Sequence, residues 1–167
     1  MKGEEGLQFT AVAKHKGLQL VLSIGNVLRP EQIGPVPNNA IVVKNAPQLE
    51  LLKKASVCIT HAGFNTLLEA LTQGVPQIAI PVTNDQLGVA ARIADKKTGQ
   101  TTSLDGLDAS NLSLLLHEVL NKPIYRDNSR SIQKAIGKKN GLSVAAELLE
   151  QAFGLTHNPS SEADSNA

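Results

Sequence analysis

Short apolar runs alternate with a helical segment in the middle of the chain. The runs VCIT (57–60) and QIAI (77–80) flank the helical pattern LLEALTQ (67–73). Short strands separated by helices are typical of βαβ units, in which parallel strands form a sheet covered by helices on both faces. The pattern predicts an α/β protein with a Rossmann-like parallel sheet.

The same alternation continues on both sides of this segment. Strands are expected at 18–24, 40–44 and 100–103, and helices at 7–16, 49–54, 85–94, 108–120 and 142–153. Asp108 or Ser110 is the expected cap of the first carboxyl-terminal helix, and Gly99 is expected to end a turn. We expect one domain over residues 1–155 and a disordered tail over 156–167.

Composition argues against a nucleic-acid partner. The 167 residues include no Trp, one Tyr and three Phe, so a stacking platform for single strands is not expected. The net charge of +1 supplies no strong field for a phosphate backbone.

Cysteine usage and the amino-terminal sequence indicate a cytoplasmic protein. The single cysteine, Cys58, lies in an apolar run and is expected to be a buried, inert thiol in a reducing compartment. No apolar run approaches the ~20 residues of a membrane span. The start MKGEEGLQF lacks the apolar region of a signal peptide.

Polar residues follow the two central strands, at the sheet edge where α/β proteins bind ligands. The loop from His61 leads through Gly63 into a helix whose unpaired N–H groups and dipole favour an anion. Gly63 allows close backbone approach, Asn65 and Thr66 add short polar side chains, and His61 can donate a hydrogen bond to a phosphate oxygen. These groups together suit a diphosphate.

Each polar residue also has a purely structural interpretation. Thr66 and Glu69 have the spacing of a capping box, and Asp85 could be an N-cap. The sequence Gly74-Val75-Pro76 is an ordinary helix stop. The combination favours a ligand, because a histidine-glycine turn, a helix start and the pair Asp85-Gln86 converge on one sheet edge.

The order of these motifs resembles a known family. It contains Pro47-Gln48, THAGFNT (60–66), Glu69-Ala70, Gly74-Val75-Pro76, Pro81 and Asp85-Gln86. This order is similar to the signature of the family 1 UDP-glycosyltransferases of GT-B fold, and within them to bacterial macrolide-type and zeaxanthin glucosyltransferases. The resemblance spans residues 18–155.

The resemblance implies a donor-binding half that holds a UDP-sugar, with UDP-glucose the expected donor. Ala46, through its backbone, and Gln48 would meet the uracil and ribose, and Glu69 would accept hydrogen bonds from ribose hydroxyls. The helix start and its histidine would bind the diphosphate, and the acid-amide pair would hold hydroxyls of the transferred sugar. The expected donor-site residues are Ala46, Gln48, His61, Gly63, Asn65, Thr66, Glu69, Asp85 and Gln86.

Two parts of the family's pattern are not found in this sequence. The family's half begins with a strand and a glycine- or serine-bearing turn near the phosphates, and Met1 to Lys16 offers no such strand. The amino-terminal half, which binds acceptor and supplies a His-Asp base, is also absent. No catalytic base is therefore identified, because no motif pairs His15, His117 or His157 with an acid.

Three functional interpretations remain. The chain is the donor half of an inverting glycosyltransferase that needs an amino-terminal acceptor half or subunit, with a small hydrophobic acceptor possible. Alternatively, it is a nonenzymatic nucleotide-sugar-binding module or remnant, or an isomerase resembling a UDP-N-acetylglucosamine 2-epimerase. No metal or cofactor is expected, because no carboxylate pair lies near the diphosphate position.

Overall fold

The structure is a computed structural model that describes residues 11–12, 15, 17–26, 33, 35–138 and 141–154. They fall into two compact units, residues 1–133 and 134–167. Ala11 and Val12 are helical, and most of the helix expected at 7–16 lies outside the described residues. The expected tail (156–167) also lies outside them, and the domain boundary at 155 stays a prediction.

The described strands form two parallel sheets. In the first, β1 (Leu20–Ser23) pairs with β2 (Ala40–Val43). In the second, the order is β3 (Cys58–Thr60), β4 (Gln77–Ala79) and β5 (Gly99–Thr101), with Ile59 opposite Ile78. The predicted α/β class with parallel strands is confirmed. The strands do not form one continuous sheet, because β1 and β3 are not hydrogen-bonded to each other.

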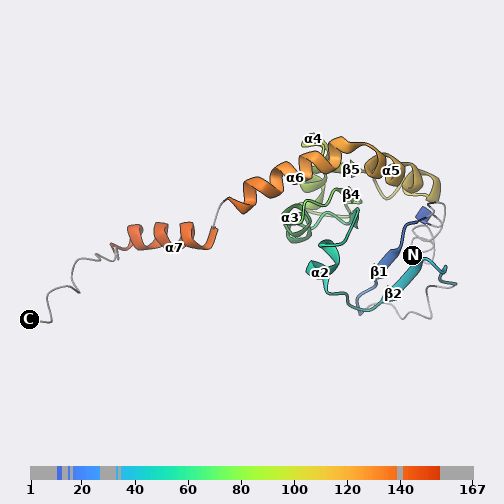
Figure 1. The fold of residues 1–167 in the computed structure, drawn as a ribbon, viewed down its shortest axis with the longest axis horizontal. Coiled ribbons are helices and arrows are strands. Elements are labelled where there is room, and N and C mark those ends of the chain that lie inside the picture. The colour runs from blue at the N-terminus through green and yellow to red at the C-terminus, as the bar shows by residue number, and fades with distance from the viewer. Residues whose placement is uncertain are drawn as a thin grey trace, which may run out of the picture. The chain divides into compact units, whose positions relative to one another are not determined.

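The described part of the chain contains six helices (Figure 1). Their bounds are α2 (Gln48–Leu52), α3 (Phe64–Thr72), α4 (Gln86–Asp95), α5 (Ala109–Asn121), α6 (Pro123–Gly137) and α7 (Gly141–Ala152). In the second unit, α7 confirms the helix predicted at 142–153, and its Leu148 and Leu149 are exposed. No helix in the described part of the chain is long and apolar enough to cross a membrane.

Two apolar clusters cover opposite faces of the β3–β5 sheet. Ile59 packs against the cluster that contains Leu112 and Leu116 of α5. The next residue back along the strand, Cys58, packs against the cluster of Leu52, Ala70 and Val75. Successive strand residues point to opposite faces, so helices cover both faces of this sheet, as the sequence pattern predicts. Burial raises the pKa of the Cys58 thiol to about 11, in agreement with an inert thiol.

The ends of the central elements depend on local hydrogen bonds and close contacts. The predicted helix stop is confirmed, since Gly74 has φ +65° and its N–H donates to Leu71 O at 3.0 Å. Gly99 does not end a turn but is the first residue of β5. A Cβ at this position would lie 1.8 Å from Gln77 O, so the strand needs a glycine here. The predicted Asp108 cap is confirmed by two 2.7 Å hydrogen bonds from backbone N–H groups of α5.

A polar cluster connects β5 to α5 and α6. The Glu118 carboxylate accepts hydrogen bonds from Lys122 Nζ at 2.8 Å and from Tyr125 Oη at 2.6 Å. The Lys122 and Tyr125 hydrogen bonds lower the pKa of Glu118 to about 2. Gln100 Nε2 also donates to this carboxylate at 2.9 Å, so the cluster joins the three elements.

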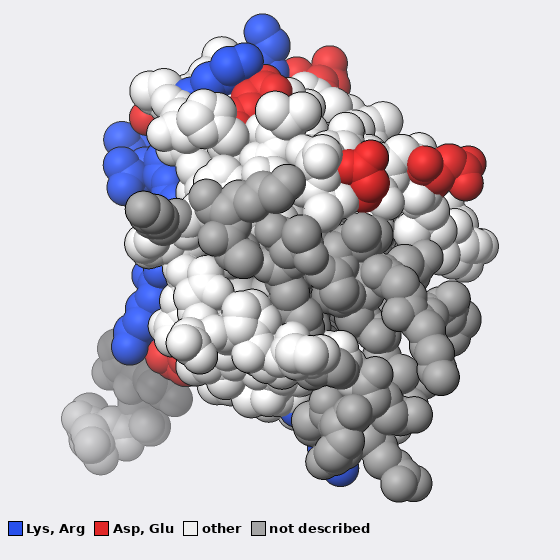
Figure 2. All heavy atoms as spheres, turned by 90° about the vertical axis from the view of Figure 1, so that its right-hand side faces the viewer, with Lys and Arg blue, Asp and Glu red and all other residues white. Residues whose placement is uncertain are grey.

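Figure 2 shows how charged side chains are distributed on one face of the molecule. Most of the described Lys and Arg side chains lie along the left edge and the top, where some Asp and Glu side chains lie beside them, and further Asp or Glu side chains lie on the right. The described residues in its centre are uncharged.

Candidate functional site

The loop between β3 and α3 presents unpaired backbone donors. Its residue Ala62 is fully buried with φ 67°, and its N–H donates to Thr60 Oγ1 at 3.2 Å. α3 begins at Phe64, three residues before the predicted start, with Gly63 as N-cap. The N–H groups of Phe64, Asn65 and Thr66 have no acceptor among the described residues. The helix start is therefore free to bind an anion.

Gly63 and His61 lie close together in this loop. A Cβ at Gly63 would stand 2.8 Å from His61 Nε2. The backbone at Gly63 is extended (φ −64°, ψ 136°), which any residue can adopt. Position 63 thus needs a glycine because a side chain would collide with the His61 imidazole, not because of its backbone conformation. The glycine lets the imidazole lie beside the start of α3.

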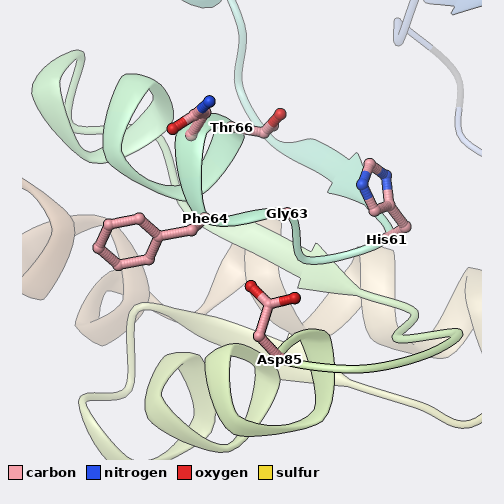
Figure 3. Close-up of a pocket in the computed structure, with 6 residues that line it drawn as sticks. His61, Gly63, Phe64, Thr66 and Asp85 are labelled. Atoms are coloured by element: carbon pink, nitrogen blue, oxygen red, sulfur yellow. The ribbon is translucent and has the colours of Figure 1, made fainter.

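A shallow cavity of about 350 Å³ opens at this helix start. Figure 3 shows the Asp85 carboxylate, at the start of α4, pointing toward the loop that carries Gly63. The cavity is lined by His61, Gly63, Phe64, Asn65, Thr66 and Asp85. Sequence reasoning missed Phe64, whose ring is half exposed, and the available signal was its place between Gly63 and Asn65.

Gln48, Thr66 and Glu69 are brought together from two helices. Gln48 Nε2 donates to Glu69 Oε2 at 2.6 Å and to Thr66 Oγ1 at 3.3 Å. The other Glu69 oxygen has no partner among the described residues, so it can accept from a ligand hydroxyl. The capping-box interpretation is wrong, because Gly63 is the N-cap and Thr66 already lies inside the helix.

The acid-amide pair lies at the start of α4. Asp85 makes no side-chain cap hydrogen bond, so the N-cap interpretation is wrong for its side chain. Gln86 Oε1 accepts from the N–H groups of Val82 and Thr83 at 2.9 and 3.0 Å. Gln86 thus holds the preceding loop through its carbonyl, while its amide nitrogen has no partner among the described residues and can donate.

A second cavity adjoins the first and is lined by two further predicted residues, Ala46 and Gln48. It has a volume of about 890 Å³ and is lined by Ala46 and Gln48 together with His61 and Thr66. His61 and Thr66 line both cavities. Seven of the nine predicted site residues therefore line two neighbouring hollows near the carboxyl ends of β3 and β4, and Glu69 and Gln86 line neither.

The fold and this sheet edge define a parallel α/β domain whose open helix start, histidine and carboxylates suit an anionic ligand. The sequence model of the family described as "UDP-glucoronosyl and UDP-glucosyl transferase" matches residues 3–136. The chain belongs to this family, whose members are glycosyltransferases, and the predicted resemblance is confirmed.

Individual relatives agree with this assignment. The chain is similar to the uncharacterized UDP-glucosyltransferase YojK of Bacillus subtilis, with 32% identity over 87% of the chain and 36% of the relative. It is also similar to the oleandomycin glycosyltransferase of Streptomyces antibioticus, with 30% identity over 84% of the chain and 33% of the relative. The solved structure of the glycosyltransferase VinC in complex with dTDP has a TM-score of 0.68 and 26% identity over 77% of the chain and 32% of its own. The chain spans about a third of the length of these relatives.

Proposed function

We propose that the chain is the donor-binding half of an inverting glycosyltransferase and that it binds a nucleoside-diphosphate sugar, UDP-glucose first among them. The observation that carries the proposal is the Gln48–Glu69 hydrogen bond of 2.6 Å beside the open start of α3. It orients a carboxylate one helical turn from a cluster of free N–H donors. The carboxylate can accept hydrogen bonds from ribose hydroxyls while the N–H groups donate to the adjacent diphosphate, so the two together suit a nucleoside diphosphate.

The diphosphate would lie at the start of α3. The N–H groups of Phe64, Asn65 and Thr66 can donate to its oxygens, and the helix dipole favours its charge. His61 Nε2, close to Gly63, would add a hydrogen bond from outside the helix. Because these donors are fixed by the fold, they would stabilise the negative charge that grows on a departing nucleotide.

The sugar would lie toward α4. The Asp85 carboxylate points into the cavity at the helix start and can accept hydrogen bonds from sugar hydroxyls. Gln86 would contribute only its amide nitrogen, because its carbonyl oxygen is held by the loop before α4. The base and ribose would lie near Ala46 and Gln48, in the adjoining cavity.

The chemistry would need a partner half that binds the acceptor. The acceptor hydroxyl would attack the anomeric carbon, its proton would pass to a base on that half, and the bond to the nucleotide oxygen would break with inversion. We propose no base on this chain, no metal ion, and a cytoplasmic location. A small hydrophobic molecule is the proposed acceptor class.

Two other functions have less support. The epimerase alternative accounts neither for Gln48 held on Glu69 nor for the Asp85-Gln86 pair. A nonenzymatic module would use the same donor contacts, so it differs from the proposal only in having no acceptor half. Restoring transfer with an added acceptor half of a related enzyme would separate the two.

Calorimetric titration of the chain with UDP, dTDP and UDP-glucose tests the proposal. We expect binding of UDP and UDP-glucose, and His61→Ala and Glu69→Ala should each weaken it by ~1 to 3 kcal/mol, as for loss of a hydrogen bond to a charged group. Asp95→Ala is the matched control, since among the described residues this exposed carboxylate pairs with Lys96 alone, at 3.0 Å. No binding at millimolar nucleotide, or equal affinity in all three variants, would refute the site.

A further inference from the structure

The loop between β4 and α4 carries Asp85 to the cavity at the start of α3. Residues 82–85 are all exposed, and Val82 is 57% exposed. A loop with so little buried surface is not held in place by packing. Its conformation therefore depends on its hydrogen bonds.

A single residue, Gln86, makes the hydrogen bonds of this loop. Its side-chain Oε1 accepts from Val82 N–H at 2.9 Å and from Thr83 N–H at 3.0 Å. Its backbone N–H donates to Thr83 O at 3.2 Å, which closes a turn over residues 83–86. Within the described part of the chain, every hydrogen bond of residues 82–84 has Gln86 as the partner.

This turn sets the backbone conformation of Asp85. Asn84 has φ 54°, a left-handed conformation that asparagine adopts more readily than most residues. Asp85 follows with a helical backbone, at φ −65° and ψ −17°. A residue whose side chain caps a helix has an extended backbone instead, and the Asp85 carboxylate makes no cap hydrogen bond. No described residue forms a hydrogen bond or an ion pair with this carboxylate, so it can bind a ligand.

Asp85 and Gln86 are placed differently relative to the cavities. Asp85 lines the cavity of about 350 Å³, and in Figure 3 its carboxylate points toward the loop that carries Gly63. Gln86 lines neither this cavity nor the adjoining one of about 890 Å³. The two neighbours thus have different tasks, because one faces the ligand and the other holds the loop that presents it.

We propose that Gln86 is a positioning residue, whose side-chain oxygen holds Asp85 in the orientation that binds the transferred sugar. This role rests on the proposed function, because it takes Asp85 as a ligand of the sugar. The larger part of the effect of Gln86 on sugar binding passes through Asp85, and a direct contact of the Gln86 amide nitrogen contributes the smaller part. A carboxylate that moves by about 1 Å loses its hydrogen bonds to the sugar even though it stays in the site.

The ratio of the affinities for UDP-glucose and UDP isolates the sugar, since the two ligands share the nucleotide contacts. Gln86→Met removes the oxygen and keeps the length of the side chain. It should lower this ratio about tenfold in calorimetric titrations, as for a lost hydrogen bond to a charged group. In a chain that already carries Asp85→Ala, the same change should lower the ratio only about threefold, as for one neutral hydrogen bond. Such non-additivity is expected of a residue that acts through its neighbour.

Gln86→Glu is the conservative variant. Its carboxylate can accept from the same two N–H groups but cannot donate to the sugar. We expect the affinity ratio to stay within about threefold of that of the original chain. Hydrogen exchange at the amides of Val82 and Thr83, measured without ligand, should match the original chain in Gln86→Glu and be faster in Gln86→Met.

Gln133→Met is the matched control. Gln133 Nε2 donates to Thr72 O at 2.9 Å, at the end of α3 opposite the cavity. The substitution therefore removes one hydrogen bond between a glutamine side chain and the backbone, without changing the loop before α4. The affinity ratio and the exchange of the two loop amides should stay unchanged.

Three results would overturn the proposal. The first is an unchanged affinity ratio in Gln86→Met, or an equal loss with and without Asp85, which would make Gln86 a direct ligand of the sugar. The second is a loss in Gln86→Glu as large as in Gln86→Met. The third is unchanged exchange at the two loop amides in Gln86→Met. In each of these cases UDP still binds, whereas no binding of UDP to the original chain would overturn the proposed function and this role together.

Discussion

Gly63→Ala would test whether His61 is held beside the start of α3 in order to bind a ligand. The new methyl group would lie 2.8 Å from His61 Nε2, closer than carbon and nitrogen atoms approach without bonding. The imidazole is exposed, so it can swing away and the fold can accommodate the change. The ring would then no longer reach the position beside the three free N–H groups.

The expected effect separates binding from stability. Loss of the His61 hydrogen bond to a charged phosphate should weaken UDP binding by ~1 to 3 kcal/mol, which is about 5- to 150-fold in Kd. The free energy of unfolding should fall by only ~1 kcal/mol, because alanine is a poorer N-cap than glycine. Calorimetry gives the first quantity and urea denaturation the second.

Gly88→Ala is the control for this substitution. Gly88 lies in α4, and a Cβ there would meet nothing within 4 Å. We expect unchanged UDP affinity and a gain in stability of ~0.5 to 1 kcal/mol from helix propensity. If Gly63→Ala bound UDP as tightly as the original chain, the reasoning about His61 would be wrong.

Three further predictions concern stability and reactivity. Glu118→Gln should lower the free energy of unfolding by ~1 kcal/mol at neutral pH. The depressed pKa of Glu118 beside Lys122 stabilises the fold above about pH 4.5. In acid denaturation series, the difference in the free energy of unfolding between the variant and the original chain should therefore shrink as the pH falls toward 2. Cys58 should react with iodoacetamide ~100-fold more slowly in the folded chain than in urea, measured by mass spectrometry, and equal rates would contradict its burial. Gly99→Ala should cost ~3 kcal/mol or more in urea denaturation, because the new Cβ would overlap Gln77 O; a fully stable variant would contradict the close approach.

Periodicity predicts bounds for the described elements other than α6, with errors at their ends. The apolar pattern places the start of α3 at Leu67, which is the first buried residue of the helix. The true first residue, Phe64, is half exposed and adds nothing to the apolar stripe. Gly99 was assigned to a turn because glycine is a common turn residue, and only the packing of β5 against Gln77 shows why a strand needs it there.

The contacts within the candidate site join residues that are far apart in the sequence, so local patterns do not predict them. Gln48 and Glu69 are 21 positions apart, and no local pattern predicts that their side chains meet at 2.6 Å. The family resemblance assigns both residues to the nucleoside of the donor but does not predict their contact, and the alternation of strands and helices predicts only the sheet edge. The division into two sheets could not be predicted from the alternation, because the alternation gives the elements but not their order in space.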